Sequence, residues 1–138
     1  GVTEYRAGAV SAERLAALLA CADLVLAPFP DGASTRRTTL AAALQHGVPV
    51  ITNAGAHTAP WLLSSTGLAI TDPEEASFRA RAHLLAQHDA QRLEAARAAR
   101  RLYDEHYRWR AVAAELARHL TPRSGPSRQS PARQEEPG

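Results

Sequence analysis

The stretch PDGASTRRTTLAAALQHGVPV, residues 30–50, decides the fold of this chain. It begins as a turn, passes through hydroxyl side chains and two arginines, and continues as a helical run of alanine and leucine up to Gly47. Glycine is typical of a helix end, and the apolar residues after it predict a buried strand over 48–52. The apolar run 24–27, closed by a proline, predicts another strand, covered on both faces of its sheet. Strand, helix and strand in this order predict a parallel βαβ unit, whose helix, residues 35–46, buries Leu40, Ala43 and Leu44.

Further strands and helices are predicted on either side of this unit. Residues 2–7 predict a short strand, and residues 11–22 a helix with a serine N-cap. Residues 67–71 predict a last, thin strand. Beyond it the sequence is helical, because the acidic, proline-containing run 72–75 is typical of a helix start and two more amphipathic segments follow. The predicted fold class is α/β, a small parallel Rossmann-like sheet with flanking helices and C-terminal helices.

The composition is that of one domain with a tail. The chain has 138 residues, of which 45% are hydrophobic, enough for a modest core. Residues 1–120 form the predicted domain, whereas residues 121–138, rich in proline, serine and arginine, predict a disordered tail. The formal charge of +2 is weak support for binding nucleic acid, and we expect none. A lone Cys21 excludes an internal disulfide, and its place late in an alanine and leucine helix predicts a buried side chain.

The sequence also bears on location and cofactors. No apolar run approaches the roughly 18 residues that a membrane-spanning helix needs, so we expect no transmembrane segment. The N-terminus does not have the pattern of a signal peptide, which favours a cytoplasmic protein. Because the chain opens directly on a strand-like stretch, we expect a fragment of something longer. The sequence has no metal-ligand spacing and no glycine-rich nucleotide fingerprint, and therefore predicts no cofactor.

Arg36 and Arg37 stand at the predicted start of the central helix, where the helix dipole places about half a positive charge. A cation there is disfavoured by roughly 0.3–1 kcal/mol unless a negative group lies close by. Ser34 and Thr35 add hydroxyl donors to the same turn. Amide, hydroxyl and guanidinium groups together suit an anion, most simply a phosphate. The cluster also falls beyond the carboxyl end of a parallel strand, where ligands of open α/β sheets bind.

These residues also have structural explanations. The two arginines could form surface ion pairs, with Asp31 or with another acid. Asp31 and Gly32 form a common turn sequence, which needs no ligand. Capping of the helix is the first prediction for Ser34 and Thr35, with ligand binding second.

The loop after the second strand reaches the same edge of the predicted sheet. There the permissive backbone of Gly55 and the ring of His57, together with Asn53, could meet a ligand. A lone histidine in a loop is, however, more often incidental. Trp61, Tyr103, Tyr107 and Trp109 are predicted to pack in the core or in an interface.

Three segments carry a resemblance to a known family: AERLAALLACADLVLAPF, DGASTRRTTLAAALQHGVPVIT and a terminal helix entered through YRW. In this order they resemble, over residues 5–120, the C-terminal half of GT-B glycosyltransferases of the large retaining group. In that half-domain a helix ends in Ala-Asp before an apolar strand and a proline, here Pro28, and the next helix ends in Gly-x-Pro-Val, here residues 47–50. The resemblance implies a nucleotide-sugar donor and a separate acceptor-binding N-terminal half-domain, which is missing from this chain.

The commonest version of this half-domain has two glutamates eight positions apart, one near the donor sugar and one on the ribose. Here these places fall on Ser34 and Ala42. The run Asp-Gly-Ala-Ser-x-Arg-Arg is instead similar to a variant in some bacterial members, in which Asp31 would substitute for the first acid. The basic loop that clamps the diphosphate in this family also precedes the first strand recognisable here. The isolated chain is therefore expected to hold part of a sugar-nucleotide site and to be inactive alone.

The predicted function is the donor side of a glycosyltransferase, with an unknown acceptor. Such chemistry depends on stabilising the departing diphosphate, so cationic and helix-end groups matter more than an acid/base pair, and no catalytic residue is assigned. One alternative is a degenerate, non-catalytic half-domain that acts as a protein-interaction module. A second is a nucleic-acid module built on the arginines, which lacks interleaved exposed aromatics. The predicted substrate-binding residues are Asp31, Gly32, Ser34, Thr35, Arg36, Arg37, Gly55 and His57.

Overall fold

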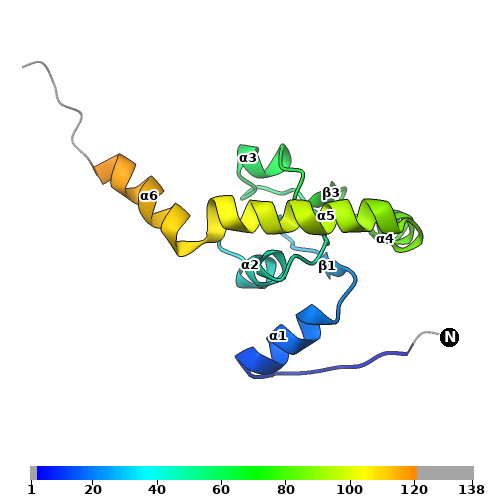
Figure 1. Ribbon diagram of the computed structural model, residues 1–138. Helices are drawn as coiled ribbons and strands as arrows, with labels where there is room; N and C mark the ends of the chain where they lie inside the picture. The colour runs from blue at the N-terminus through cyan, green and yellow to red at the C-terminus, as the bar shows by residue number, and fades with distance from the viewer. Residues whose placement is uncertain (1–2, 121–138) are drawn as a thin grey trace, which may run out of the picture.

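A parallel three-stranded sheet forms the centre of the computed structural model, which describes residues 3–120 (Figure 1). The strands are β1 (Val25–Ala27), β2 (Val50–Asn53) and β3 (Ala69–Thr71), in the order β1-β2-β3. Val25 pairs with Val50, and Ile51 pairs with Ala69. Because all three strands are parallel, their carboxyl ends meet at one edge of the sheet. The predicted α/β class with a small parallel sheet is confirmed.

Helices connect the strands and cover the sheet. The α2 helix (Thr38–Gln45) links β1 to β2 as predicted, and the short α3 helix (Pro60–Leu63) links β2 to β3. The order is completed by α1 (Ala12–Ala20) before β1, by α4 (Glu75–Gln87) and α5 (Asp89–Leu102) after β3, and by a π-helical turn, η1 (Tyr103–Tyr107), that leads into α6 (Trp109–Leu120).

Two hydrophobic cores lie on opposite faces of the sheet. On one face, α2 packs against β1 and β2, with Leu40, Ala43 and Leu44 fully buried as predicted, and α5 packs against α2. On the other face, α4 covers β2 and β3, where Phe78 packs against Ile51. This second layer leaves the Leu26 side chain of β1 53% exposed. The prediction that strand 24–27 is covered on both faces is therefore wrong.

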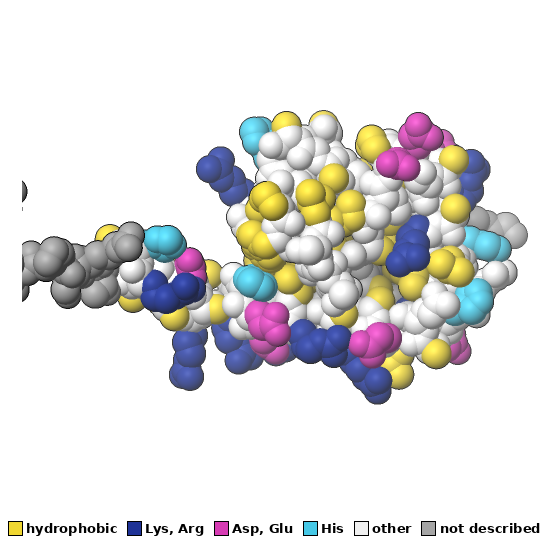
Figure 2. Space-filling view, turned by 90° about the horizontal axis from the view of Figure 1, so that it is seen from above, with side chains coloured by type: hydrophobic (Ala, Val, Ile, Leu, Met, Phe, Trp, Pro, Cys, Tyr) yellow, Lys and Arg dark blue, Asp and Glu magenta, His cyan; other side chains and the backbone are white. Residues whose placement is uncertain are grey.

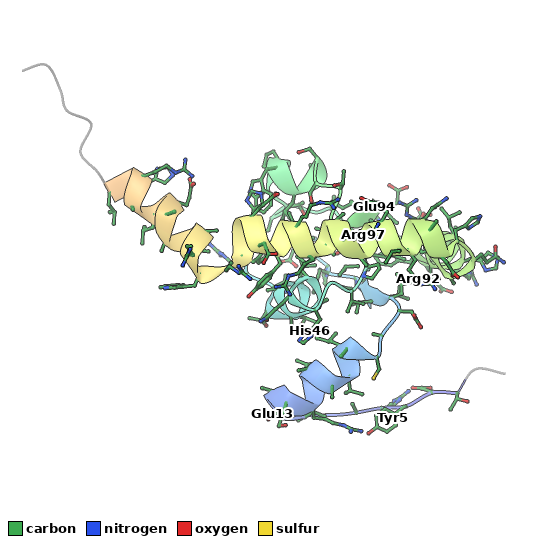
Figure 3. The ribbon with its side chains drawn as sticks, in the orientation of Figure 1. Tyr5, Glu13, His46, Arg92, Glu94 and Arg97 are labelled. Atoms are coloured by element: carbon green, nitrogen blue, oxygen red, sulfur yellow. The ribbon has the colours of Figure 1, made fainter. Side chains whose placement is uncertain are left out.

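The α1 helix lies at the margin of the fold, and none of its residues is buried. Ser11 caps it as predicted, because its hydroxyl accepts a hydrogen bond from the Arg14 amide. Cys21 follows the last residue of α1 and is exposed, so the prediction of a buried thiol is wrong. Residues 3–7 form no strand, against the prediction for 2–7, since no described strand lies beside them to complete a ladder. Tyr5 in this segment is 70% exposed (labelled in Figure 3).

The helical C-terminal part packs on the body of the fold as far as η1, whereas α6 extends away from it. Trp61, Tyr103 and Tyr107 pack against the larger core as predicted, and burial raises the pKa of Tyr107 to about 12. In contrast, α6 projects from the body and contacts it chiefly through η1 (Figures 1 and 2). Trp109 is 81% exposed and is therefore not part of the core, so the alternative that it lies in an interface stays a prediction. The predicted tail, residues 121–138, lies outside the described residues.

Ion pairs neutralise much of the charge on α5. Figure 2 shows basic and acidic side chains next to one another along one margin of the body. Arg92 pairs with Asp89 at 2.8 Å, and Glu94 accepts from Arg101 at 3.0 Å and lies 3.9 Å from Arg97 (Figure 3). These arginines therefore form a solvated surface and not a free basic stripe. No helix within residues 3–120 is long and apolar enough to cross a membrane.

Candidate functional site

A hollow of about 480 Å³ lies beyond the carboxyl ends of β1 and β2. Its position follows from the parallel sheet, because the loops after the two strands leave at the same edge. The structure thus brings together six of the eight predicted site residues. The hollow is lined by Asp31, Ser34, Thr35, Arg36, Arg37 and His57.

The other two predicted residues, Gly32 and Gly55, hold the two loops against each other. Gly32 has a φ of +85°, and a Cβ added to it would lie 2.2 Å from the Gly55 nitrogen. A Cβ on Gly55 would lie 2.4 Å from the carbonyl carbon of Asp31. The loops therefore touch through backbone atoms, which leaves no room for a side chain. The glycines shape the hollow and do not line it.

The buried side chain of Asn53, the last residue of β2, forms hydrogen bonds with the backbone that follows β1. Its side chain accepts a hydrogen bond from the Phe29 amide at 2.9 Å and donates one to the Phe29 carbonyl at 2.8 Å. Its own carbonyl accepts from the Ala33 amide at 2.8 Å, and the residue is 2% exposed. Its amide group is thus used within the protein, and the prediction that Asn53 meets a ligand is wrong.

The preceding residue, Thr52, also forms a side-chain hydrogen bond with the backbone of β1. Its hydroxyl donates to the Ala27 carbonyl at 2.8 Å, and the residue is fully buried. Polar groups buried in a core are retained where they are hydrogen-bonded. Two consecutive polar residues at the end of an otherwise apolar strand therefore join β2 to β1 and to the loop that follows β1.

The α2 helix begins at Thr38, three residues later than predicted. Arg37 is its N-cap, and no side chain of residues 3–120 caps the helix. The prediction that Ser34 and Thr35 cap this helix is therefore wrong. Ser34 instead accepts a hydrogen bond from the Arg37 amide through its backbone carbonyl, at 3.1 Å. A helix leaves its first amides without intrahelical acceptors. Within residues 3–120 no hydrogen bond uses the amides of Thr38, Thr39 and Leu40.

The two arginines have different surroundings. The Arg37 guanidinium contacts the Asp31 carboxylate through Nη2 and Oδ1, and it lies over the Phe29 ring, 4.7 Å from the centroid. The ion-pair alternative is thus correct for Arg37. Arg36 is exposed and has no ion pair within residues 3–120. Among the described residues, one cation beside the start of α2 is therefore left without an ion pair.

His57 lies in the loop that follows β2 and also lines the hollow. Its amide donates to the Asp31 carbonyl at 3.2 Å, which ties the two loops together once more. Its ring is exposed and has no hydrogen bond within residues 3–120. The ring is therefore available to a ligand in the hollow.

Sequence reasoning missed two residues of this site. Phe29 supplies the aromatic face under Arg37, and Thr58 accepts the Gly55 amide at 3.0 Å. An aromatic residue two positions after a strand and a nearby arginine were the available signal for the first. The second depends on how the loop folds and has no sequence signal. No group of three or more His, Cys, Asp or Glu side chains in the described part of the chain could hold a metal ion.

The difference between the arginines predicts different effects on stability. Arg37→Gln removes an ion pair and a cation–π contact, so we expect it to lower the free energy of unfolding by about 1 kcal/mol. Arg36→Gln removes a cation from the positive end of α2 and should leave stability level or raise it by a few tenths of a kcal/mol, roughly. Urea unfolding of both variants measures this. Equal destabilisation by the two substitutions would contradict the assignment.

Comparisons with protein-family models, with curated proteins and with solved structures found no match to this chain.

Proposed function

We propose that the hollow binds the diphosphate of a nucleotide-sugar and that the chain forms the donor side of a GT-B type glycosyltransferase. The observation that carries the proposal is Arg36, which has no ion pair among residues 3–120, beside a start of α2 that no described side chain caps, at the carboxyl edge of a parallel sheet. Backbone amides at a helix start and an arginine are the groups that proteins commonly use for phosphate. The resemblance of segments 12–29, 31–52 and 107–109 to that family supports the nucleotide-sugar as the source of the phosphate.

The site can assist glycosyl transfer by stabilising the leaving group. When the sugar departs, negative charge develops on the diphosphate, and preorganised donors lower the energy of that charge. Arg36 and the first amides of α2 are such donors, and the hydroxyls of Ser34 and Thr35 line the same hollow. This role needs no proton transfer from the chain, which agrees with a site whose carboxylate, Asp31, is engaged by Arg37.

The exposed apolar surface of α6 favours an interaction with a separate half-domain that binds the acceptor. The α6 helix exposes four apolar side chains at helical spacing, and they are between 41% and 81% exposed. Contiguous exposed apolar surface is typical of an interaction site. We therefore expect no sugar transfer by these 138 residues alone. The four side chains are Trp109, Val112, Leu116 and Leu120.

A second candidate is a non-catalytic half-domain that binds a protein. The same apolar face of α6 favours it, as does Ala42, which stands where the family has a glutamate. The two candidates differ in the hollow, because only the first requires that it bind phosphate.

The test is a titration of the ¹⁵N-labelled chain with nucleoside diphosphates, followed by amide chemical shifts. If the proposal is correct, the amides of Thr38, Thr39 and Leu40 shift in a saturable way, whereas the parent nucleosides leave them unchanged. Arg36→Gln should raise the Kd by about tenfold or more, because a charge-assisted contact is lost.

Arg14→Gln is the matched control for this titration. Arg14 is also exposed and without an ion pair in the described chain, but it lies on α1 and does not line the hollow. The control should leave the Kd unchanged within twofold, roughly, since its charge is distant and screened by salt. No shift at the start of α2, or equal losses in both variants, would contradict the proposal and favour the protein-interaction module.

A further inference from the structure

The ion pair between Asp31 and Arg37 places a carboxylate inside the hollow to which we assign an anion. Both residues line the hollow, and the guanidinium contacts the carboxylate directly. Arg36, the other arginine of the hollow, has no ion pair in the described chain. Within the described residues, a bound phosphate therefore meets one arginine without an ion pair, Arg36, and one that is already neutralised by the protein's own acid, Arg37.

Arg37 does not depend on Asp31 for its position. Its guanidinium lies 4.7 Å from the centroid of the Phe29 ring. The backbone of Phe29 is held on both sides by the buried Asn53 side chain, at 2.9 and 2.8 Å. A cation remains attracted to an aromatic face when a carboxylate leaves. Arg37 thus stays at the hollow and becomes available when Asp31 releases it.

Asp31 can release Arg37 without any movement of its loop. The Asp31 carbonyl accepts the His57 amide at 3.2 Å, and the next amide, of Gly32, donates to the Phe29 carbonyl at 3.1 Å. These bonds hold the backbone. The Asp31 side chain itself is 41% exposed, so rotation about its own bonds moves the carboxylate into solvent.

We propose that Asp31 is a built-in competitor of the anionic ligand, which occupies Arg37 in the ligand-free protein and is displaced by a phosphate group. This inference rests on the proposed function, because it assumes that the hollow takes an anion. Every ligand must compensate for the lost ion pair and for the repulsion of the nearby carboxylate. A diphosphate carries more charge than a single phosphate and compensates better. Asp31 therefore makes the hollow selective for diphosphate groups over weakly charged anions.

The experiment measures the Kd of inorganic phosphate and of pyrophosphate from the shifts of the Thr38 to Leu40 amides. In Asp31→Asn the carboxylate is lost and Arg37 is free, so we expect phosphate to bind about tenfold more tightly, because water in the open hollow screens most of the interaction with a charge a few ångströms away. Adding Arg37→Gln to this variant should cancel most of the gain. Spectra of each variant without ligand establish that it is folded, and Asp31→Ser replaces the asparagine variant where that one does not fold.

Asp72→Asn is the matched control. Asp72 is exposed and directly follows β3 at the same edge of the sheet, but it does not line the hollow. It removes the same formal charge and should change the Kd by less than about twofold. If both variants lowered the Kd of phosphate equally, the change in net charge would explain the effect, and the inference would be overturned.

The remaining outcomes separate this inference from the proposed function. If the wild-type chain binds pyrophosphate at the α2 amides and Asp31→Asn binds phosphate no more tightly, the competitor role is overturned while the phosphate site stands. Weaker binding of phosphate by Asp31→Asn would mean that the carboxylate supports the anion and would likewise overturn the competitor role. If neither protein shows a shift with either probe, both proposals are overturned.

Discussion

Replacing Gly32 with alanine is expected to lower the free energy of unfolding by about 3 kcal/mol or more and to abolish phosphate binding in the hollow. Two costs add up. The residue has a φ of +85°, which disfavours any side chain, and the new Cβ would lie 2.2 Å from the nitrogen and 2.6 Å from the Cα of Gly55. Because these are backbone atoms, the two loops must separate. Chemical denaturation and the amide titration together measure both effects.

Gly8→Ala provides the control for the backbone conformation alone. Gly8 also has a positive φ, +63°, but a Cβ there would meet no atom within 4 Å. We expect its cost to stay at about 1 kcal/mol or less, because only the conformational term remains and alanine also restricts the unfolded chain. A Gly32 variant as stable as the Gly8 variant would show that the loops do not touch as described.

Replacing Asn53 with alanine is expected to lower the free energy of unfolding by about 2–4 kcal/mol. The substitution removes the side chain that bonds the Phe29 amide and carbonyl. The amide is left without its acceptor beside a buried position, whereas the carbonyl keeps the Gly32 amide at 3.1 Å. The Phe29 ring, and with it Arg37, loses its fixed place. Phosphate binding should therefore weaken as well, which amide shifts at the start of α2 will report.

Thr52→Val is the matched control for Asn53. Thr52 is equally buried and also bonds β1, but with one hydrogen bond, to the Ala27 carbonyl, and within the sheet. Its loss should cost about 1 kcal/mol, since the shape is kept, and should leave phosphate binding unchanged. If the two variants lose stability and binding equally, Asn53 contributes only to the sheet and does not position the hollow.

The arrangement of the site was largely predictable because it follows from chain topology. An alanine and leucine helix between two apolar runs implied a βαβ unit, and such a unit brings the segment 31–37 and the loop after β2 to one edge. Six of the predicted residues line one hollow for this reason. The individual roles were less predictable. Capping depends on where the helix starts, and α2 starts at Thr38, beyond the reach of both proposed caps.

The sequence by itself determined the α/β class, the burial of Leu40, Ala43 and Leu44, and the sheet edge at which the polar residues gather, because periodicity and chain order are local properties. Only the tertiary structure decided which of two adjacent arginines is neutralised, that Asn53 bonds Phe29, and that Cys21 and Leu26 are exposed. Each of these depends on which atoms meet across more than one element. Adjacent residues with the same side chain have the same intrinsic chemistry, so Arg36 and Arg37 differ only through the loop geometry that brings Asp31 and Phe29 to one of them.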